Sequence, residues 1–521
     1  MNLSNKLNPL QVEIDKVRNW DRKAHKKSRS IEWVFVLLLN IFILIMLNFD
    51  YSYLDLPKKF YSLTKPHLNN CANVFLLNNQ ICDEFKLKIN KKEKLINLLF
   101  SNKNYRKSFA QAYAGHQFGH FTKLGDGRAI IIGEHVTEHN KRFDIQLKGA
   151  GATKYSRNGD GKATLGSMLR EYLISEAMHY LNIPTSRSLA VIKTGENIYR
   201  SSKEEGSILV RIMKSHIRVG TFEYASYFGS SEDLKRFTSY SIKRLYPEIS
   251  KYDNPPLALL DLVMQKQIDL VVDWMRVGFI HGVMNTDNTS ISGESFDYGP
   301  CAFMNTFHPD TVYSSIDYNG IYAFGNQPKI IKWNILKFAE ALLPIIHHNK
   351  DKSIQLAQSI IDKFDAIWEK KYYSMMLKKI GFSNHKTELY PLIDELLLLM
   401  KKLKMDYTNT FYFLSQNNYN KNHTSIHNDF TKWKKKWNKS VEKTTSMTEA
   451  KHLMHKYNPV FIARNHLVNQ AIQKAVHGDL TPINKFLEIL ANPYQYQDES
   501  KEYMKPPTAK FEKCFKTFCG T

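Results

Sequence analysis

The order of apolar patterns along this chain separates strands from helices, and that separation limits the folds the chain can adopt. Short apolar runs bounded by glycine and charged turns indicate strands. They lie at 129–133, 143–147, 188–193 and 207–213. Residues 165–182, in their midst, repeat apolar residues at helical spacing. After Ile330 nearly every segment is typical of a helix. A strand-rich first half and a helical second half predict an α+β fold.

A long amphipathic helix is predicted between these halves. It opens at Pro255-Pro256 and ends near Gly278, and a largely apolar stripe runs along one side. The stripe is formed by Leu260, Val263, Gln267, Val271 and Trp274. A polar loop at 281–288 follows, and then an Asp-Tyr-Gly turn that begins at Asp297. This order predicts a protein-kinase-like fold, with a small β-rich lobe, a larger helical lobe and a helical C-terminal extension.

The charge and the cysteines exclude some classes of protein. The formal net charge is +23, but lysine is spread along the chain without an RNA- or DNA-binding motif, so we interpret it as a solvated surface and expect no nucleic acid partner. The five cysteines are odd in number and form no CxxC pair. This pattern argues against a disulfide framework or a zinc site and favours a reducing, cytoplasmic location.

The N-terminus suggests attachment to a membrane. Residues 1–30 form a basic extension, and the stretch from Trp33 to Leu47 is apolar except for Asn40. This length is near the lower limit of about 17 residues for a spanning helix. We therefore expect residues 31–49 to be a candidate transmembrane helix that anchors the protein, with the basic flank in the cytoplasm. The alternatives are a buried helix or an incorrectly chosen start codon.

The strongest chemical pattern is Asp287-Asn288 together with Asp297. Amide and carboxylate oxygens suit Mg²⁺, with phosphates and water at its other positions, so Asn288 and Asp297 are the candidate metal ligands. Asp287 is then left to act as a base on a hydroxyl. An Asp-Asn pair alone is typical of a turn or helix cap. Its place after a long helix and ten residues before Asp-Tyr-Gly favours a functional role.

Candidate phosphate-binding cations lie on the predicted sheet. Lys148 ends a predicted strand, and Glu171 follows 23 residues later on the next helix, an arrangement that directs an ammonium group at a nucleotide. Arg211 and Arg218 are seven residues apart and are suited to clamp terminal phosphates. Taken singly, the lysine fits a surface position and the arginines fit surface ion pairs.

Two glycine turns provide a candidate cradle for the nucleotide. In Gly125-Asp-Gly-Arg128, Gly127 allows a close backbone approach and Arg128 offers a fork to phosphate oxygens. A second flexible turn, Ser156–Gly161, contains Asp160 between two glycines. Each turn alone is also typical of an ordinary hairpin.

Several long strings of the sequence resemble the selenoprotein O family, also called the YdiU family. Three of these strings are AYAGHQFGHFTKLGDGRAIIIGE, VDWMRVGFIHGVMNTDNTSISGESFDYGP and the ending TFCGT. The similar strings span 112–134, 144–192, 272–300, 326–342, 458–465 and 517–521. The resemblance runs from about Leu47 to Thr521.

The resemblance assigns a role to each candidate residue. It implies a pseudokinase that binds ATP in a flipped orientation and transfers AMP to Ser, Thr or Tyr of protein substrates, or UMP from UTP, with Mg²⁺ or Mn²⁺. The family's proposed base matches Asp287, its metal ligands match Asn288 and Asp297, and its helix glutamate, which pairs with Lys148, matches Glu171. Its nucleotide-binding positions match Gly125, Gly127, Arg128, Lys148, Asp160, Gly161, Arg211, Arg218 and Asp297. Its C-terminal Cys or selenocysteine matches Cys519.

The expected organisation combines both lines of reasoning. Residues 50–521 are interpreted as the family's domain, divided into a nucleotide-binding lobe (about 100–225), a helical lobe with the catalytic and metal loops (226–345) and a helical C-terminal region (346–521). Residues 414–446, rich in Asn, Lys and Ser, are predicted to be a mobile insertion. Two other functions stay open. One is a phosphoryl-transferring kinase, although Asp287 and Asn288 are adjacent rather than five apart, and the other is a nucleotide-binding scaffold without catalysis.

Overall fold

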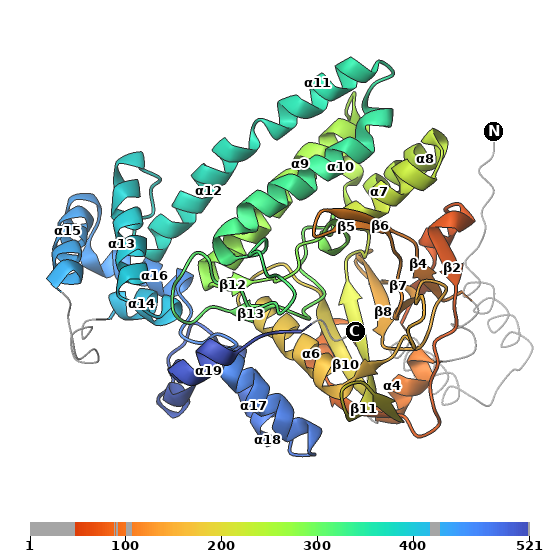
Figure 1. Cartoon of the computed structure of the whole chain (residues 1–521), viewed down its shortest axis with the longest axis horizontal. Coiled ribbons are helices and arrows are strands. Elements are labelled where there is room, and N and C mark those ends of the chain that lie inside the picture. Colours follow the sequence, from red (N-terminus) through yellow and green to blue (C-terminus); the bar gives the residue numbers. More distant parts are fainter. Residues whose placement is uncertain (1–46, 88, 90–91, 101–106, 417–427, 519–521) are drawn as a thin grey trace, which may run out of the picture.

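The structure, a computed structural model, describes residues 47–87, 89, 92–100, 107–416 and 428–518. Within these residues a nine-stranded sheet forms one lobe, and helices form a second lobe and a C-terminal extension (Figure 1). Strands come mainly from the first half of the chain and helices from the second, as the sequence predicted. The chain therefore has the predicted α+β, protein-kinase-like architecture.

The large sheet is antiparallel throughout, in the order β2-β4-β7-β8-β11-β10-β3. β1 adds to β7 and β9 adds to β11. The strands are β1 (Phe49–Asp50), β2 (Tyr61–Leu63), β3 (Asn73–Leu77), β4 (Phe109–Gln111), β7 (Ala129–Val136), β8 (Arg142–Lys148), β9 (Ala163–Thr164), β10 (Arg187–Tyr199) and β11 (Lys203–Met213). The predicted strands thus form the centre of the sheet. The sheet also contains β1 to β3, which precede the range of 100–225 expected for the nucleotide-binding lobe.

The alternation of side chains along the central strands separates two cores. Ile130 of β7 and Leu147 of β8 join an outer core with residues of α3 (Asn79–Glu84) and α4 (Lys92–Leu99). Ile131 joins the main core instead. Because successive side chains of a strand point to opposite faces, Lys148 and its neighbours at even positions of β8 point away from the outer core.

Helix α6 (Leu165–Tyr180) connects the sheet to the rest of the molecule. One side packs on β10 and β11, and the other side packs on α17 and α18 of the C-terminal region (Figure 1). Glu171, in the second turn of this helix, is buried. A charged side chain at this contact requires a partner of opposite charge, and the sheet supplies it.

Helix α9 (Pro255–Val277) runs through the centre of the helical lobe. Its predicted stripe is buried along its whole length. The Asn254 side chain caps the first turn by accepting a hydrogen bond from the Leu257 amide at 3.1 Å. Gly278 ends the helix in the left-handed region, at φ 74°. The chain then turns into the polar loop and into η4 (Thr286–Asn288), a short 3₁₀ turn.

The other strands and α-helices of the described residues lie outside the large sheet. They are β5 (Ala114–Gln117), β6 (His120–Lys123), α7 (Val219–Phe228), α8 (Ser231–Leu245), β12 (Phe279–Ile280), β13 (Ala302–Phe303), α10 (Gln327–Ile346), α11 (Lys350–Ile361), α12 (Phe364–Lys379), α13 (Tyr390–Lys402), α14 (Tyr407–Leu414), α15 (Asn428–Thr444), α16 (Met447–Tyr457), α17 (Asn465–Val476), α18 (Thr481–Leu490) and α19 (Ala509–Cys514).

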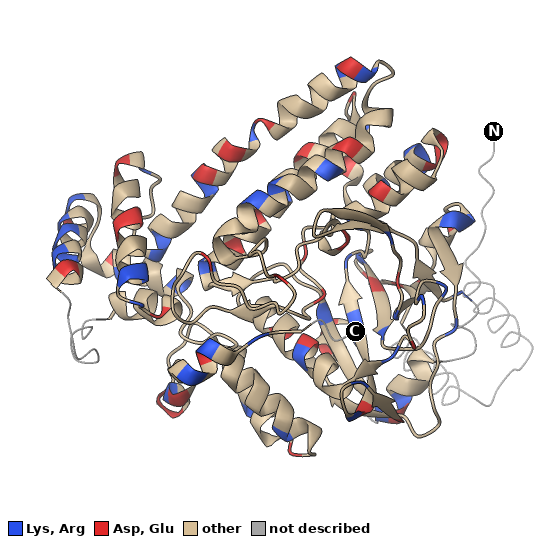
Figure 2. Cartoon of the chain, viewed as in Figure 1, with Lys and Arg blue, Asp and Glu red and all other residues tan. Residues whose placement is uncertain are grey.

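The prediction of a mobile insertion at 414–446 was wrong for the part of it that the structure describes. Residues 428–444 form α15, which packs on α13. The rings of Trp433 and Trp437 are buried and stacked 6.2 Å apart. None of the lysines and asparagines of this helix is buried (lysines are blue in Figure 2), so its composition is that of an amphipathic surface helix.

The proposed membrane anchor lies almost wholly outside the described residues. Residues 1–30 and 31–46 are not described, and Phe49, at the end of the candidate span, is part of strand β1. Among the helices that the structure does describe, none has the length and apolar character needed to cross a bilayer.

Candidate functional site

Four charged side chains meet at the inner face of the sheet. Lys148 Nζ donates to Glu171 Oε2 at 2.7 Å and to Asp297 Oδ1 at 2.5 Å. Arg211 donates to the same Asp297 oxygen at 2.6 Å and also to Glu171. The predicted pair of strand lysine and helix glutamate is therefore present in the structure. Two cations and two anions balance one another, and all of these side chains except Asp297 are almost completely buried.

The pKa values of both carboxyl groups reflect this pairing. Burial alone raises the pKa of Asp297, but Arg211 and Lys148 together hold it well below its usual range. Burial likewise opposes ionisation of Glu171, and the same two cations lower its pKa below the ordinary value. Both carboxylates are consequently charged at neutral pH. Asp297 adopts a left-handed backbone at φ 61°, which is uncommon for a residue other than glycine and typical of functional turns.

Arg218 joins the sheet side of the site to the loop that carries Asp287. Its guanidinium donates to the backbone oxygen of Asp287 at 2.9 Å and lies 3.5 Å from an oxygen of Asp126. The Tyr113 ring faces it at 4.1 Å from the ring centroid. The side chain is buried, so these contacts fix its position and hold the Asp287 turn against the sheet.

Asp287 has the environment expected of a base. It is 8% exposed, and its Oδ1 atom has no hydrogen-bond partner among the described residues. Burial raises the pKa of Asp287 to about 7, against the opposing charge of Arg218. A carboxyl group that titrates near neutral pH accepts a proton more readily than an exposed aspartate does.

Asn288 and Asp297 offer a donor set that fits a magnesium ion. The Asn288 amide nitrogen donates to the Val283 carbonyl at 3.0 Å, which orients the side chain and leaves its oxygen for another partner. The contacts of Asp297 with Lys148 and Arg211 both end on Oδ1. No cluster of three or more His, Cys, Asp or Glu suited to a metal occurs in the described part of the chain. Magnesium accepts such a sparse protein set when phosphate and water supply its other ligands.

The two glycine turns pack on each other. A Cβ atom at Gly125 would lie 2.3 Å from Cγ of Tyr155, and one at Gly161 would lie 2.1 Å from the backbone oxygen of Gly151. Gly161 also has φ +67°, which favours glycine. The Thr153 hydroxyl donates to the Asp126 carbonyl at 2.6 Å and ties the second turn to the first. The two turns thus form one wall.

Asp160 is held by an arginine that the sequence reasoning missed. Arg200 donates to both oxygens of Asp160, at 2.8 and 3.0 Å. It lies between β10 and β11, in a hairpin turn 40 residues further along the chain. A single arginine in a polar turn carries no sequence signal of such a role. Because this bidentate pair braces the second glycine turn, Asp160 has a structural contact in addition to any contact with nucleotide.

All but one of the predicted site residues line a single cavity of about 980 Å³ between the lobes. Glu171 is the exception, since it lies behind Lys148 and holds it. The predicted residues in the lining are Gly125, Gly127, Arg128, Lys148, Asp160, Gly161, Arg211, Arg218, Asp287, Asn288 and Asp297. The volume lies at the upper end of the range for small-molecule pockets, which suits a nucleotide with part of an acceptor.

The far end of the chain forms part of the cavity wall. The Thr517 hydroxyl donates to the Pro300 carbonyl at 2.6 Å, and its backbone bonds to Tyr313 and Ser315 at 2.8 and 2.9 Å. Phe518 lines the cavity. Cys519, matched above to the family's C-terminal Cys or selenocysteine, lies outside the described residues.

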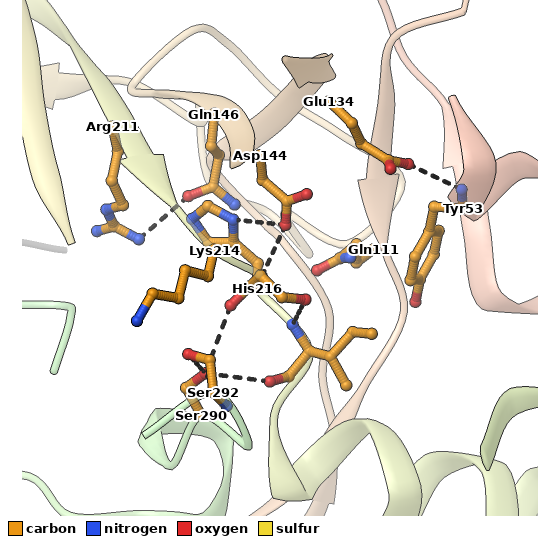
Figure 3. Close-up of polar contacts among 12 residues, drawn as sticks. Tyr53, Gln111, Glu134, Asp144, Gln146, Arg211, Lys214, His216, Ser290 and Ser292 are labelled. Atoms are coloured by element: carbon orange, nitrogen blue, oxygen red, sulfur yellow. Dashed lines mark hydrogen bonds and ion pairs between the residues drawn. The ribbon is translucent and has the colours of Figure 1, made fainter. Parts of the chain in front are cut away.

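A buried polar network supports the segment between Arg211 and Arg218 (Figure 3). His216 bonds to Asp144 through its ring at 3.1 Å and through its backbone amide at 2.7 Å, and Arg211 donates to Gln146 at 3.1 Å. Ser290 bonds to Ser292 at 2.9 Å and donates to the backbone beside His216. This network fixes the two arginines relative to the loop that contains Asp287.

Sequence comparisons find similar proteins over most of the chain. A profile of the family described as "Protein adenylyltransferase SelO" matches residues 43–491. The "Protein nucleotidyltransferase YdiU" of Pelagibacter ubique is 49% identical over 479 residues, which cover 91% of this chain and 99% of that protein. Proteins of the same name from Bacillus cereus and Clostridium perfringens are 48% and 46% identical, and each match covers 91% of this chain and 98% of theirs.

A comparison with solved structures matches ROP2 from Toxoplasma gondii, "a virulence factor with a protein-kinase fold and no enzymatic activity". The match covers 57% of this chain and 87% of that chain, with 9% sequence identity and a TM-score of 0.24. At this TM-score the similarity adds nothing to the fold derived above.

Proposed function

The chain belongs to the SelO family of protein adenylyltransferases and is a protein nucleotidyltransferase, and we propose that it transfers AMP from ATP to Ser, Thr or Tyr hydroxyls of other proteins. The observation that carries this proposal is the cavity whose lining brings Asp287 together with the charge cluster of Lys148, Arg211 and Asp297. One part of the cavity suits an acceptor hydroxyl and the other suits phosphates.

The proposed reaction is a displacement at the α-phosphorus of ATP. The acceptor oxygen forms a bond to this phosphorus, and the bond from phosphorus to the oxygen bridging toward the β-phosphate breaks. Pyrophosphate leaves with that oxygen and its electron pair. The hydroxyl proton passes to the carboxylate of Asp287, whose pKa is raised by burial. The products are a protein with a phosphodiester-linked AMP and free pyrophosphate.

The chain's own cations position the phosphates in this proposal. Lys148 and Arg211 are held on the cavity side of the sheet by Glu171, so each is already oriented and little side-chain entropy is lost when phosphate binds. The glycine turn at 125–128 brings backbone and Arg128 to the same space. Asn288 and Asp297 are the residues that would hold Mg²⁺ or Mn²⁺, which when bound neutralises phosphate charge during transfer.

Position-labelled ATP separates this proposal from its rivals. The purified chain is incubated with Mg²⁺ or Mn²⁺, acceptor proteins and ATP labelled at either the α- or the γ-phosphate. Protein labelled from α-labelled ATP alone supports the proposal, whereas label from γ-labelled ATP alone means a kinase. Nucleotide binding with neither label means a scaffold. Parallel assays with α-labelled ATP and α-labelled UTP at equal concentrations identify the preferred donor.

A pair of aspartate variants adds a matched control. Asp297→Asn keeps the shape of the side chain but removes the charge that both Lys148 and Arg211 contact, and we expect it to abolish transfer. Asp365→Asn makes the same change at an exposed side chain of α12 that pairs only at the surface with Lys332, and it should leave transfer unchanged. Full activity of Asp297→Asn rejects the assigned metal site.

A further inference from the structure

The hairpin β5–β6 forms its own two-stranded sheet rather than joining the large one. It packs against α7 (Figure 1) and against η4, the turn that contains Asp287. Gln117 and Phe118, at its tip, line the cavity. The hairpin is therefore a wall of the site that contributes none of the residues assigned above.

His116 of this hairpin is anchored from two directions. Its ring nitrogen Nδ1 lies 2.5 Å from Oε1 of Glu223 on α7, and the rings of Phe121 and Trp333 pack on it at 5.1 and 5.2 Å. Its backbone amide donates to the Thr286 hydroxyl at 2.8 Å. One residue thus connects α7 to the residue directly before Asp287.

Burying the Glu223 carboxyl group at this position costs folding free energy. Its side chain is 1% exposed, and its second oxygen has no hydrogen-bond partner among the described residues. Burial raises the pKa of Glu223 to about 7, offset in part by the Thr286 side chain. A buried carboxyl group with so few partners destabilises a fold, so its presence here indicates a role in holding His116.

The hairpin also bounds the base directly. A Cβ atom at Gly115 would lie 2.5 Å from Oδ1 of Asp287, so the strand backbone lies against the carboxyl group and restricts its position on that side. Arg218 holds the backbone of the same residue from the sheet side. The position of the Asp287 carboxyl group therefore depends on where the hairpin lies.

We propose that His116 and Glu223 are positioning residues for the transfer reaction: they hold Thr286 and the hairpin in register, so that Gly115 directs the Asp287 carboxyl group toward the acceptor hydroxyl. The inference rests on the proposed function only in naming Asp287 as the base. Neither residue touches nucleotide in this account. Their loss should slow the chemical step and leave ATP binding intact, because the phosphate-binding groups lie on other elements.

The first experiment compares variants at Thr286. Thr286→Val removes the oxygen that accepts from His116, and Thr286→Ser keeps it. We expect Thr286→Val and His116→Ala to lower kcat by about 10- to 100-fold with the Kd for ATP within about 3-fold, and Thr286→Ser to restore kcat. Thr238→Val is the matched control, since Thr238 is buried in α8 and its hydroxyl has no partner among the described residues. Wild-type kcat in Thr286→Val overturns the proposal.

The second experiment does not depend on activity. In the nucleotide-free protein, hydrogen–deuterium exchange of the segment 283–289 should rise in His116→Ala and in Glu223→Gln but not in Thr238→Val. The double variant Glu223→Gln/Thr286→Val should lose no more kcat than the worse single variant, because both changes break one chain of contacts. Unchanged exchange together with additive losses refutes the positioning role. If wild-type protein transfers no label, the proposed function fails, and the exchange result still decides this inference.

Discussion

Replacing Gly115 by Ala should slow transfer without unfolding the protein. The new Cβ atom would lie 2.5 Å from Oδ1 of Asp287 and 2.9 Å from its Cβ, whereas ordinary contacts begin at 3.4 Å. Gly115 has no positive φ, so alanine adds no backbone strain. The only way to relieve the overlap is a shift of Asp287 or of the hairpin by about 1 Å.

The expected magnitude follows from that shift. A displacement of about 1 Å at a catalytic group costs about 100-fold in rate, or roughly 2.7 kcal/mol in the activation free energy. The free energy of unfolding changes less. Overpacking costs about 1–3 kcal/mol, and replacing glycine by alanine within a strand returns about 0.5–1 kcal/mol.

Initial rates with α-labelled ATP measure this loss as kcat, and thermal unfolding checks that the variant is folded. Gly166→Ala is the matched control, because a Cβ atom at this position in α6 meets only Cγ2 of Ile472, at 3.7 Å. It should raise stability by about 0.5–1 kcal/mol and leave the rate unchanged. A folded Gly115→Ala protein with wild-type kcat refutes the assignment of Asp287 as a base restricted by the hairpin.

Three further substitutions test other parts of the structure by urea unfolding. Lys148→Met leaves Asp297 with one fewer buried partner and should lower the free energy of unfolding by about 3 kcal/mol. Burial raises the pKa of Glu294 to about 7, so wild-type stability is full below the ordinary value of 4.5 and is lost as the pH rises through 7. Glu294→Gln removes that loss, and it should be more stable than wild type by about 3 kcal/mol at pH 8 and equal to it at pH 4. Trp437→Ala removes a buried ring that donates to the Ile380 carbonyl at 2.8 Å, and should cost about 3–5 kcal/mol; no change there would mean that α15 is loosely attached after all.

The grouping of the candidate residues around one cavity was largely predictable, because the proposed chemistry requires particular residue types at fixed places. Lys148, Asp287 and Asp297 follow a strand, a helix and a loop whose patterns are clear from the sequence. Arg200 and Glu223 were missed, since each acts through a partner that is distant in sequence and neither stands in a distinctive local pattern. Such contacts form only when the chain folds, so the spacing of residues along the sequence does not indicate them.

The errors in the fold have similar causes. Strands β1 to β3 have two to five residues each, and β1 pairs with β7 more than 80 positions along the chain, so their local sequence resembles turns. The composition of 414–446, rich in Asn, Lys and Ser, predicts a mobile insertion, but part of this stretch forms helix α15. The spacing of its buried residues, Phe430, Trp433, Trp437 and Val441, does fit a helix, and periodicity rather than composition was the informative signal.

The bond from Thr517 to Pro300 has a consequence for the order in which a new molecule matures. It joins residues 217 positions apart, and the wall that it secures is supplied by almost the last described part of the chain. During synthesis the sheet and the charged cluster around Lys148 can assemble while hundreds of residues are still missing. A ribosome-bound intermediate can thus acquire the means to bind phosphates before its acceptor side is closed. A fusion partner placed after residue 518 would hinder the docking of Thr517 against Pro300, so reporter tags are better attached elsewhere.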